Sequence, residues 1–328
     1  MRGAVVGTGL MKISVYITSY NQKGYLREAI ESVLAQTLKP FEVLVADDGS
    51  TDGSPEMIRA YEGRYGGLVR GIFHDRNMGV ARTRVDALAA VRGEAVSYVD
   101  GDDRWLPEKL EREAAALAAH PEAAIAFSNH YYVTAAGERT GRWVEAGHRP
   151  PEGEVFCETF GRWYPRRDIF RMELIRMDAF RRVGFHDVAF ETFEDYDLRI
   201  RLTKALRTVY VDEPLAEVRR HGGGLSSAAA ERQVETLMRV YRKNRGLLAD
   251  VPPEARRLAV RGFRRWVGPF AREAAVRVVN DASRGFWARR VKAAGFLWRA
   301  IRYAPDSVRW GDLYRVFLPA RTAERLND

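Results

Sequence analysis

The sequence has few features of a secreted or membrane-spanning protein. It contains one cysteine, Cys157, among 328 residues, and one thiol cannot build a disulfide framework or a cysteine-based zinc site. No run of about 18 apolar residues occurs, which predicts that no helix crosses a membrane. Residues 1–10 are too short and too glycine-rich for a signal peptide and are interpreted as an N-terminal extension. We therefore expect a cytoplasmic protein.

Positive charge is concentrated toward the C-terminal end. Residues 226–328 carry 22 lysines and arginines against 10 acidic residues, whereas the whole chain has 53 against 44. The overall composition, 46% hydrophobic and 30% charged, is typical of a globular protein. The uneven charge predicts that the C-terminal segment meets an anionic partner.

Short apolar strands alternate with amphipathic helices over the first 133 residues. Strands are predicted at 13–17, 41–46, 67–73, 94–99 and 123–133, and helices at 24–36, from 54 onward, at 80–91 and at 107–119. This alternation predicts βαβ units and a mainly parallel sheet. Ligands bind beyond the carboxyl ends of such strands. We therefore expect the polar segments 18–21, 47–52 and 100–103 to converge on one edge.

The pattern changes further along the chain. A helix is predicted over 171–183, a strand over 208–211 and a basic, glycine-rich loop over 219–226. Beyond residue 226 the alternation ceases. Helices are predicted there at 228–246, 253–266, 269–279, 283–303 and 307–317.

Three carboxylates lie within four residues directly after the strand at 94–99. They belong to Asp100, Asp102 and Asp103. Like charges packed together repel, and burying them without partners is costly. A divalent cation would remove that cost, and carboxylate oxygens suit Mg²⁺ or Mn²⁺. An acidic surface turn is the alternative, but the expected convergence of three polar loops favours a site.

Five motifs, in order, resemble the signatures of family 2 glycosyltransferases, which are inverting enzymes with the GT-A fold. They are VYITSYN at 15–21, DDGSTD at 47–52, RNMGVAR at 76–82, DGDD at 100–103 and EDYD at 194–197. The resemblance implies an α/β GT-A domain over residues 11–225, with a Rossmann-like mixed sheet flanked by helices. It does not cover residues 226–328, which we expect to form a basic, all-α C-terminal domain.

A nucleotide-sugar donor needs a slot for its base and an anchor for its ribose. Thr18 offers a small hydroxyl and Tyr20 an aromatic ring, while Asp47 or Asp48 can accept from a base N–H or a ribose hydroxyl. By resemblance, Thr18, Tyr20 and Asp48 hold the base, and Arg82 reaches the nucleotide or its diphosphate. The alternatives are a turn with local side-chain bonds at 47–52 and an ordinary surface arginine.

The acidic cluster resembles the DxD element of the family. The resemblance implies that Asp100 lies toward the ribose or a metal-bound water. It implies that Asp102 and Asp103 hold Mg²⁺ or Mn²⁺, bridged to both phosphates, and it leaves open which of the two touches the metal directly.

His221 matches a region of the family that closes over the diphosphate. It is a candidate metal ligand or phosphate donor, and a loop histidine without such a role is the alternative. The neighbouring Arg219 and Arg220 suit an anionic donor under either interpretation.

Glu194 and Asp195 resemble the ED element of the family. Inverting transfer needs a base near the acceptor hydroxyl, and Asp195 is the candidate, with Glu194 positioning it or the acceptor. A carboxylate that only favours the start of a helix is the alternative.

Aromatic residues interleave with arginine in the C-terminal segment. Such helices suit an anionic membrane surface, where a lipid-linked acceptor would be reached. The alternative is a helical domain whose tryptophans form its core or a homodimer interface. Nucleic acid is not expected, because no recognition fold accompanies the basic residues.

Together these features lead us to expect an inverting, metal-dependent, hexosyltransferase-like enzyme. It would move a sugar from a nucleotide-diphosphate donor, with a UDP-sugar as the first expectation, to a hydroxyl of a saccharide or lipid-linked acceptor. The setting would be surface polysaccharide synthesis at the inner face of the membrane. A sugar-phosphate nucleotidyltransferase is one alternative, disfavoured because no glycine-rich basic loop follows the first strand. A non-catalytic, membrane-docked binding module is the other, disfavoured by the intact carboxylates.

Overall fold

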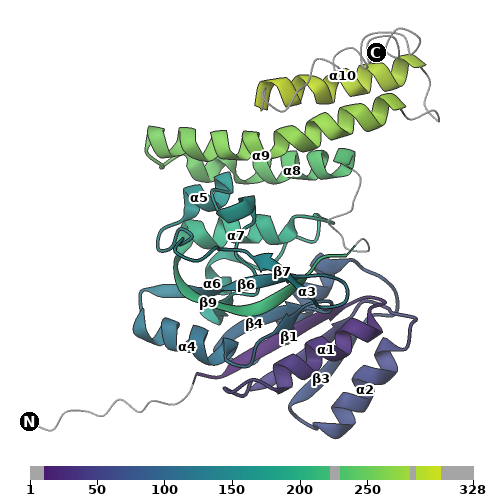
Figure 1. The fold of residues 1–328 in the computed structure, drawn as a ribbon, viewed down its shortest axis with the longest axis vertical. Helices are drawn as coiled ribbons and strands as arrows, with labels where there is room; N and C mark the ends of the chain where they lie inside the picture. The colour runs from purple at the N-terminus through teal and green to yellow at the C-terminus, as the bar shows by residue number, and fades with distance from the viewer. Residues whose placement is uncertain (1–10, 222–229, 281–285, 304–328) are drawn as a thin grey trace, which may run out of the picture. The chain divides into compact units, whose positions relative to one another are not determined.

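The computed structural model describes residues 11–221, 230–280 and 286–303 (Figure 1). The chain divides into two compact units, each described by itself below. The first comprises Met1–Glu154, Phe170–Ala189 and Ala205–His221, and the second comprises Val155–Ile169, Phe190–Lys204 and Gly222–Asp328. The predicted division after residue 225 is linear, whereas the second unit also takes two segments from the middle of the chain.

A mixed sheet forms the centre of the first unit (Figure 1). In the described part of the chain it has nine strands, in the order β3-β2-β1-β4-β8-β6-β9-β5, with β7 added beside β6. They are β1 Ile13–Ser19, β2 Glu42–Asp47, β3 Val69–Phe73, β4 Ala95–Asp100, β5 Arg104–Trp105, β6 Ala123–Val133, β7 Arg139–Arg142, β8 Leu174–Arg176 and β9 Arg207–Arg219. The strands β1 to β4 pair in parallel. The predicted α/β class is confirmed.

Helices flank this sheet. They are α1 Lys23–Leu34, α2 Ser54–Arg64, α3 Val80–Ala89, α4 Lys109–Ala119 and α6 Met177–Val183. Helix α1 buries Leu26, Ile30 and Val33, whose spacing of four and three residues places them on one face. Burying such a side chain contributes about 1.5–3 kcal/mol. The apolar periodicity that predicted these helices is therefore the face that holds them to the sheet.

Two predicted elements of the first unit are wrong in extent. The helix predicted over 171–183 begins only at Met177, because Leu174 and Ile175 pair with β6 and β4 as strand β8. The strand predicted over 208–211 continues to Arg219. Pro214 lies where the pairing of β9 with β6 is irregular, so its missing N–H breaks no regular ladder bond. Tertiary pairing decided both cases.

The second unit is helical in its described part. Its elements are α5 Phe156–Gly161, α7 Glu194–Ala205, α8 Ala230–Asn244, α9 Pro253–Asn280 and α10 Phe286–Tyr303, with short 3₁₀ turns η1 Pro165–Arg167 and η3 Arg245–Leu248. Phe160, Tyr241 and Phe263 stack or meet edge to face in its core. A Cβ on Gly262 would lie 2.3 Å from the Gly161 carbonyl oxygen, so α5 and α9 approach closely only because glycine is present.

Helix α9 runs through Pro269 without a break. The two helices predicted at 253–266 and 269–279 are therefore one. Proline inside a helix costs about 3 kcal/mol, and the buried Trp266, Val267 and Ala271 on either side of it offset that cost. The helix predicted at 307–317, the N-terminal extension 1–10 and the loop residues 222–226 lie outside the described residues.

Glu42 is the first residue of β2 and lies at the amino ends of the parallel strands, opposite the candidate site. It links β2 to Ser14 of β1 and to Arg92, which follows α3. Its fully buried carboxylate accepts hydrogen bonds from the Ser14 hydroxyl at 2.7 Å, the Arg92 backbone N–H at 2.6 Å and Arg92 Nε at 2.8 Å. Burial by itself raises the pKa of Glu42, but the hydrogen bonds from Ser14 and Arg92 lower it more, so the pKa lies below its ordinary value of 4.5. The native state thus favours the carboxylate.

Glu42→Gln is expected to lower the free energy of unfolding by about 2 kcal/mol at neutral pH, because it weakens a buried, charge-assisted network. A carboxyl with a lowered native pKa stabilises the fold above its unfolded pKa, and that contribution disappears as the pH falls through the native value. The stability difference between wild type and variant should therefore shrink below pH 4.5. Urea denaturation at several pH values measures it.

Glu108→Gln is the matched control, because Glu108 is exposed and lies 3.7 Å from Arg112. Its effect should stay within about 0.5 kcal/mol. Equal losses in the two variants would contradict the assignment of Glu42 as a buried structural carboxylate.

Candidate active site

The carboxyl ends of β1, β2 and β4 lie side by side. Thr18 pairs in register with Ala46 on one side and Asp100 on the other, and Ser19 pairs with Asp47. The predicted convergence of the three polar loops on one edge is therefore confirmed.

The loop after β2 is held by its own side chains. The Asp47 carboxylate accepts from the Ser50 backbone N–H at 2.8 Å and from the Ser50 hydroxyl at 2.7 Å. Asn21 Oδ1 accepts from the Thr51 N–H at 2.8 Å, which ties this loop to the one after β1. Gly49 has φ +77°, and a Cβ there would lie 2.5 Å from the Arg76 carbonyl carbon. Asp47 therefore shapes the turn itself.

Asp48 anchors the segment 76–79 that leads into α3. Its buried carboxylate accepts from the Met78 N–H at 2.7 Å and the Gly79 N–H at 2.9 Å, and lies 2.8 Å from His74 Nδ1. These contacts fix the loop beside the strand ends. The hydrogen bonds of the Asp48 carboxylate are thus with His74, Met78 and Gly79. The predicted role of Asp48 in holding a nucleotide base stays a prediction.

Arg84, which was not among the predicted site residues, pairs with Asp100. Arg84 Nη2 donates to Asp100 Oδ1 at 2.7 Å, and its guanidinium lies 5.2 Å from the Tyr98 ring centre. The Thr18 hydroxyl lies 3.4 Å from the same carboxylate oxygen. Arg82 is half-exposed and pairs with Asp86 at 2.8 Å, one helical turn away.

Sequence reasoning missed Arg84, although a signal existed. Ala81, Arg84 and Leu88 are spaced by three and four residues and lie on the buried face of α3. A charged side chain on a buried face requires a partner of opposite charge. Asp100 is that partner.

Asp102 and Asp103 have different surroundings. Asp102 Oδ2 lies 2.9 Å from His221 Nε2, and both side chains are partly exposed. Asp103 is buried, and its Oδ1 accepts from the Arg219 backbone N–H at 2.7 Å. Burial, followed by the charges of Asp102 and Asp100, raises the pKa of Asp103 well above its ordinary value. The structure therefore brings Asp102 and His221 together and turns Asp103 toward β9.

Gly101 separates the first two carboxylates for a steric reason. Its N–H donates to the Thr18 carbonyl at 2.9 Å. A Cβ at this position would lie 2.7 Å from that same oxygen. Any larger residue would push the acidic loop away from β1.

Arg219, the last residue of β9, fixes the acidic loop at residues 100–103 by hydrogen bonds. Its side chain is almost fully buried and lies over the Tyr25 ring, with 4.4 Å from the guanidinium carbon to the ring centre. Nε donates to the Asp102 carbonyl at 2.8 Å, Nη1 to the Ala135 carbonyl at 2.7 Å and Nη2 to Glu28 Oε2 at 2.8 Å. The guanidinium thus positions the acidic loop instead of facing a donor.

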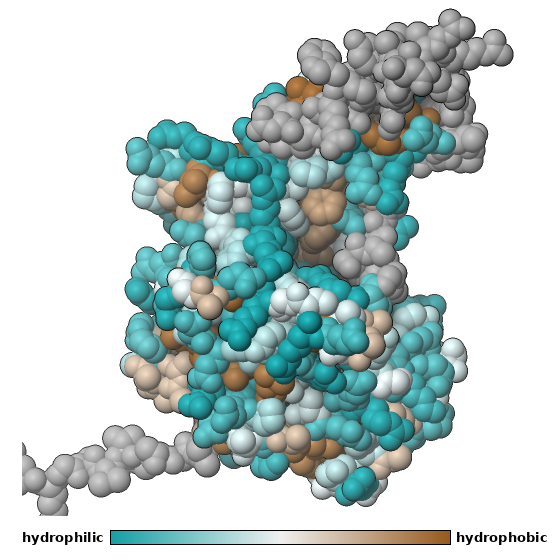
Figure 2. Space-filling view, viewed as in Figure 1, coloured by the Kyte–Doolittle hydropathy of each residue, from teal (hydrophilic) through white to brown (hydrophobic). Residues whose placement is uncertain are grey.

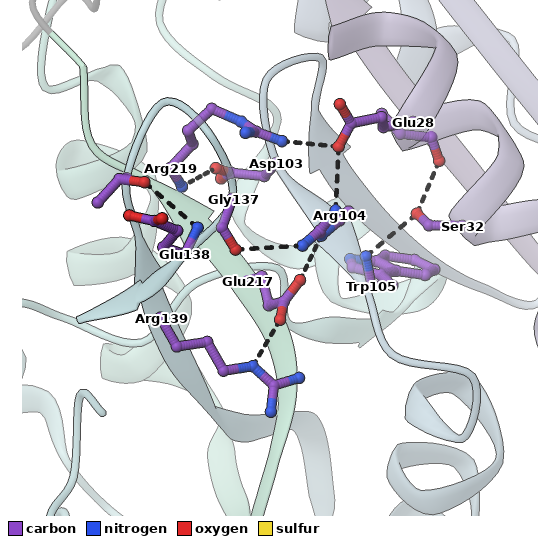
Figure 3. Close-up of polar contacts among 12 residues, drawn as sticks. Glu28, Ser32, Asp103, Arg104, Trp105, Gly137, Glu138, Arg139, Glu217 and Arg219 are labelled. Atoms are coloured by element: carbon purple, nitrogen blue, oxygen red, sulfur yellow. Dashed lines mark hydrogen bonds and ion pairs between the residues drawn. The ribbon is translucent and has the colours of Figure 1, made fainter. Parts of the chain in front are cut away.

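Arg104 extends this network (Figure 3). It donates to Glu28 Oε2 at 3.1 Å and to the buried carboxylate of Glu217, which also accepts from Arg139 Nε at 2.7 Å. Burial by itself raises the pKa of Glu217, but the hydrogen bonds from Arg139 and Arg104 lower it more, so the pKa lies below its ordinary value. Figure 3 shows Arg104 and Arg219 both directed at Glu28.

Tyr20 follows the end of β1 with an accessible ring. It is 45% exposed, whereas Thr18, two residues earlier, is buried. An exposed aromatic ring at the end of a parallel strand is available for stacking on a planar base. Its predicted contact with a base stays a prediction.

The second unit holds the predicted ED residues at the start of α7. The Asp195 carboxylate is about one-third exposed and lies 2.5 Å from Arg199 Nη1. Glu194 is buried. Asp197 is fully buried and accepts from Lys243 Nζ at 2.8 Å and Asn244 Nδ2 at 2.7 Å. Asp195 is therefore the accessible carboxylate of the Asp195–Asp197 pair, and Asp197 joins α7 to α8.

The comparison with protein families decides the class. The model described as Glycosyl transferase family 2 matches residues 14–189, which is more than half of the chain. The chain belongs to glycosyltransferase family 2. The resemblance found in the motifs is thereby confirmed, and family membership favours glycosyl transfer over nucleotidyl transfer.

Relatives and solved structures agree with this family. TuaG of Bacillus subtilis, named for teichuronic acid biosynthesis, is 34% identical over 31% of this chain and 40% of its own. The chain matches only about a third of the length of the first curated relatives. Residues 1–349 of TarS from Staphylococcus aureus superpose with a TM-score of 0.58 at 17% identity, covering 92% of this chain and 93% of that one.

A mannosyltransferase, PcManGT of Pyrobaculum calidifontis, superposes with a TM-score of 0.57 at 16% identity over 94% of this chain and 86% of that one. At these identities the likeness concerns the fold alone. The family 2 glycosyltransferase thus has the predicted GT-A fold, accompanied by C-terminal helices.

Arg84→Gln is expected to weaken binding of a nucleotide-sugar donor by about tenfold or more, because it leaves Asp100 without its buried cation. Arg82→Gln is the matched control on the same helix and should change binding by less than about twofold, because its ion pair is exposed. Isothermal titration with nucleoside diphosphates compares the two. A larger loss in the Arg82 variant would favour the predicted contact of Arg82 with the donor over a role for Arg84.

Proposed function

We propose that this family 2 glycosyltransferase moves a sugar from a nucleotide-diphosphate donor to a hydroxyl of a saccharide or glycolipid acceptor, with inversion at the anomeric carbon. The observation that carries the proposal is the Asp102–His221 pair, 2.9 Å apart, beside the Asp100–Arg84 pair at the end of β4. Both lie where parallel α/β sheets bind ligands.

The donor nucleotide is assigned to the edge formed by β1, β2 and β4. Tyr20 stacks on or borders the base, and Thr18 and Asp100 face the ribose. Asp47 and Asp48 support this slot by fixing its walls, as their contacts with Ser50, Met78 and Gly79 indicate. Complexes of TarS carry UDP and UDP-GlcNAc, and that of PcManGT carries GDP-Man, so a UDP-sugar is the first donor to test.

A divalent cation fits the donor set at the end of β4. Mg²⁺ is commonly held by one or two protein ligands together with substrate phosphates, and Asp102 with His221 supplies one oxygen and one nitrogen. In the described residues, no three potential ligand side chains gather into a ready-made metal cluster. We assign Asp102 and His221 as ligands and Asp103 as the carboxylate that ties the loop to Arg219. When bound, Mg²⁺ or Mn²⁺ stabilises negative charge on the leaving diphosphate.

The neighbours support a metal only by analogy. The structure of PcManGT was determined with GDP-Man and Mn²⁺. Its low identity to this chain limits the likeness to the fold, so the present assignment relies on the chemistry of Asp102 and His221.

Asp195 is assigned as the catalytic base. Its carboxylate accepts the proton of the acceptor hydroxyl, while that oxygen forms a bond to the anomeric carbon. The bond from the same carbon to the diphosphate oxygen breaks, and the electron pair leaves with the nucleoside diphosphate. Arg199, 2.5 Å away, holds the Asp195 carboxylate in place. Glu194 positions the base or the acceptor.

Polysaccharide synthesis is the proposed setting. TuaG, with which this chain shares 34% identity over 101 residues, is named for teichuronic acid biosynthesis. The acceptor proposed here is therefore a growing surface saccharide or its lipid-linked precursor.

Asp102→Asn is expected to reduce metal-dependent hydrolysis of a UDP-sugar by about 100-fold and to abolish thermal stabilisation by UDP with Mn²⁺, because a direct metal ligand is lost. Asp103→Asn is the matched control, since an asparagine oxygen can still accept from the Arg219 N–H. It should retain hydrolysis within about fivefold. If both variants lose hydrolysis equally, Asp103 shares the metal. Full hydrolysis in Asp102→Asn would contradict the assignment of Asp102 as a metal ligand, whereas no hydrolysis by the wild type would favour a non-catalytic binding module.

Asp195→Asn is expected to lower kcat for transfer by about 10³-fold at unchanged donor KM, because a general base contributes about 10²–10⁴. Asp197→Asn, in contrast, should lower the melting temperature, because Asp197 is buried among Lys243, Asn244 and Arg201. Transfer kinetics and thermal unfolding of both variants separate the two roles. Unaltered transfer by Asp195→Asn would show that another group takes the proton.

A further inference from the structure

Helix α10 presents two apolar faces. Ala293, Phe296, Leu297 and Ala300 are buried and pack this helix against α9. Trp287, Val291, Trp298 and Ile301 are instead 76%, 72%, 57% and 42% exposed. The second set is spaced by four, seven and three residues, which places it on one side of the helix. We call these four residues the α10 stripe.

The opposite face of α10 packs the helix against α9, and the α10 stripe lies on the other side of the helix. Along the helix it extends over about 21 Å at 1.5 Å per residue. Figure 2 shows hydrophobic surface among the hydrophilic residues in the part of the molecule where Figure 1 places α9 and α10. Exposed apolar surface of this kind marks an interaction site.

The charges of α10 all have one sign. The helix contains Arg289, Arg290, Lys292, Arg299 and Arg302 and no acidic residue. Lys292 pairs with Glu231 of α8 at 2.7 Å. Arg302 lies 5.2 Å from the centre of the Trp298 ring. Basic residues therefore flank the stripe, and a partner with negative charge is complementary to it.

We propose that the α10 stripe docks this protein on the surface of an anionic lipid bilayer. A helix with tryptophans on its apolar side and only cations among its charges lies in the plane of the interface. Among the described helices, none is long and apolar enough to cross a membrane, so the helix rests on the bilayer. Two other occupants fit the stripe less well. A second copy of the chain would place the cations of one α10 against those of the other, and a nucleic acid would neutralise the cations but leave the apolar side chains exposed.

The test uses the full chain and vesicles. Wild type should float with vesicles that contain phosphatidylglycerol, bind vesicles of phosphatidylcholine alone more weakly, and lose binding in high salt. Val291→Ser combined with Trp298→Ser should weaken binding to the anionic vesicles by about tenfold or more. Circular dichroism checks folding, and Trp298→Ser alone should give a smaller loss if the double variant unfolds.

Val188→Ser combined with Leu258→Ser is the matched control, because these side chains are 55% and 41% exposed elsewhere. It should bind vesicles as wild type does. The proposal is overturned if wild type ignores anionic vesicles, if the stripe variant binds them normally, or if a wild-type dimer in solution is lost in that variant. Donor hydrolysis without vesicles should be unchanged in the stripe variant, so this proposal and the proposed catalytic function fail separately.

Discussion

The buried guanidinium of Arg219 is the contact on which the geometry of the candidate donor site depends. It ends β9 and binds the Asp102 carbonyl, the Ala135 carbonyl and Glu28, while its backbone N–H binds Asp103. Five donors in a rigid planar fork suit such a junction, and lysine could not replace them. His221 lies two residues further along the chain. The position of His221 beside Asp102 therefore follows from the way Arg219 is held.

The site is built in layers that differ in exposure. Three carboxylates are buried, and their oxygens accept hydrogen bonds from backbone N–H groups; they belong to Asp47, Asp48 and Asp103. These hydrogen bonds shape the loops. Asp102 and His221 remain partly exposed. A buried carboxylate that lacked such partners would be costly. The same residue type thus serves the fold where it is buried and remains available for chemistry where water reaches it.

The helical unit follows the same logic. Asp197 is buried and joins α7 to α8, whereas its neighbour Asp195 keeps an accessible carboxylate oriented by Arg199. Helix α10 is fixed by one apolar face and leaves another exposed. In both units, therefore, buried charged groups hold the elements together, and partly exposed ones stay accessible.

The sequence by itself determined the strand–helix alternation, the three polar loops after β1, β2 and β4, and the family, because these depend on local periodicity and on short motifs. It also predicted that Arg82 reaches the nucleotide or its diphosphate, and that role stays a prediction. The tertiary structure alone decided that Arg84 pairs with Asp100, that Asp103 faces Arg219 and that β9 continues past Pro214. Those outcomes depend on strand pairing and burial between residues up to 116 positions apart, and no local pattern encodes contacts at that separation.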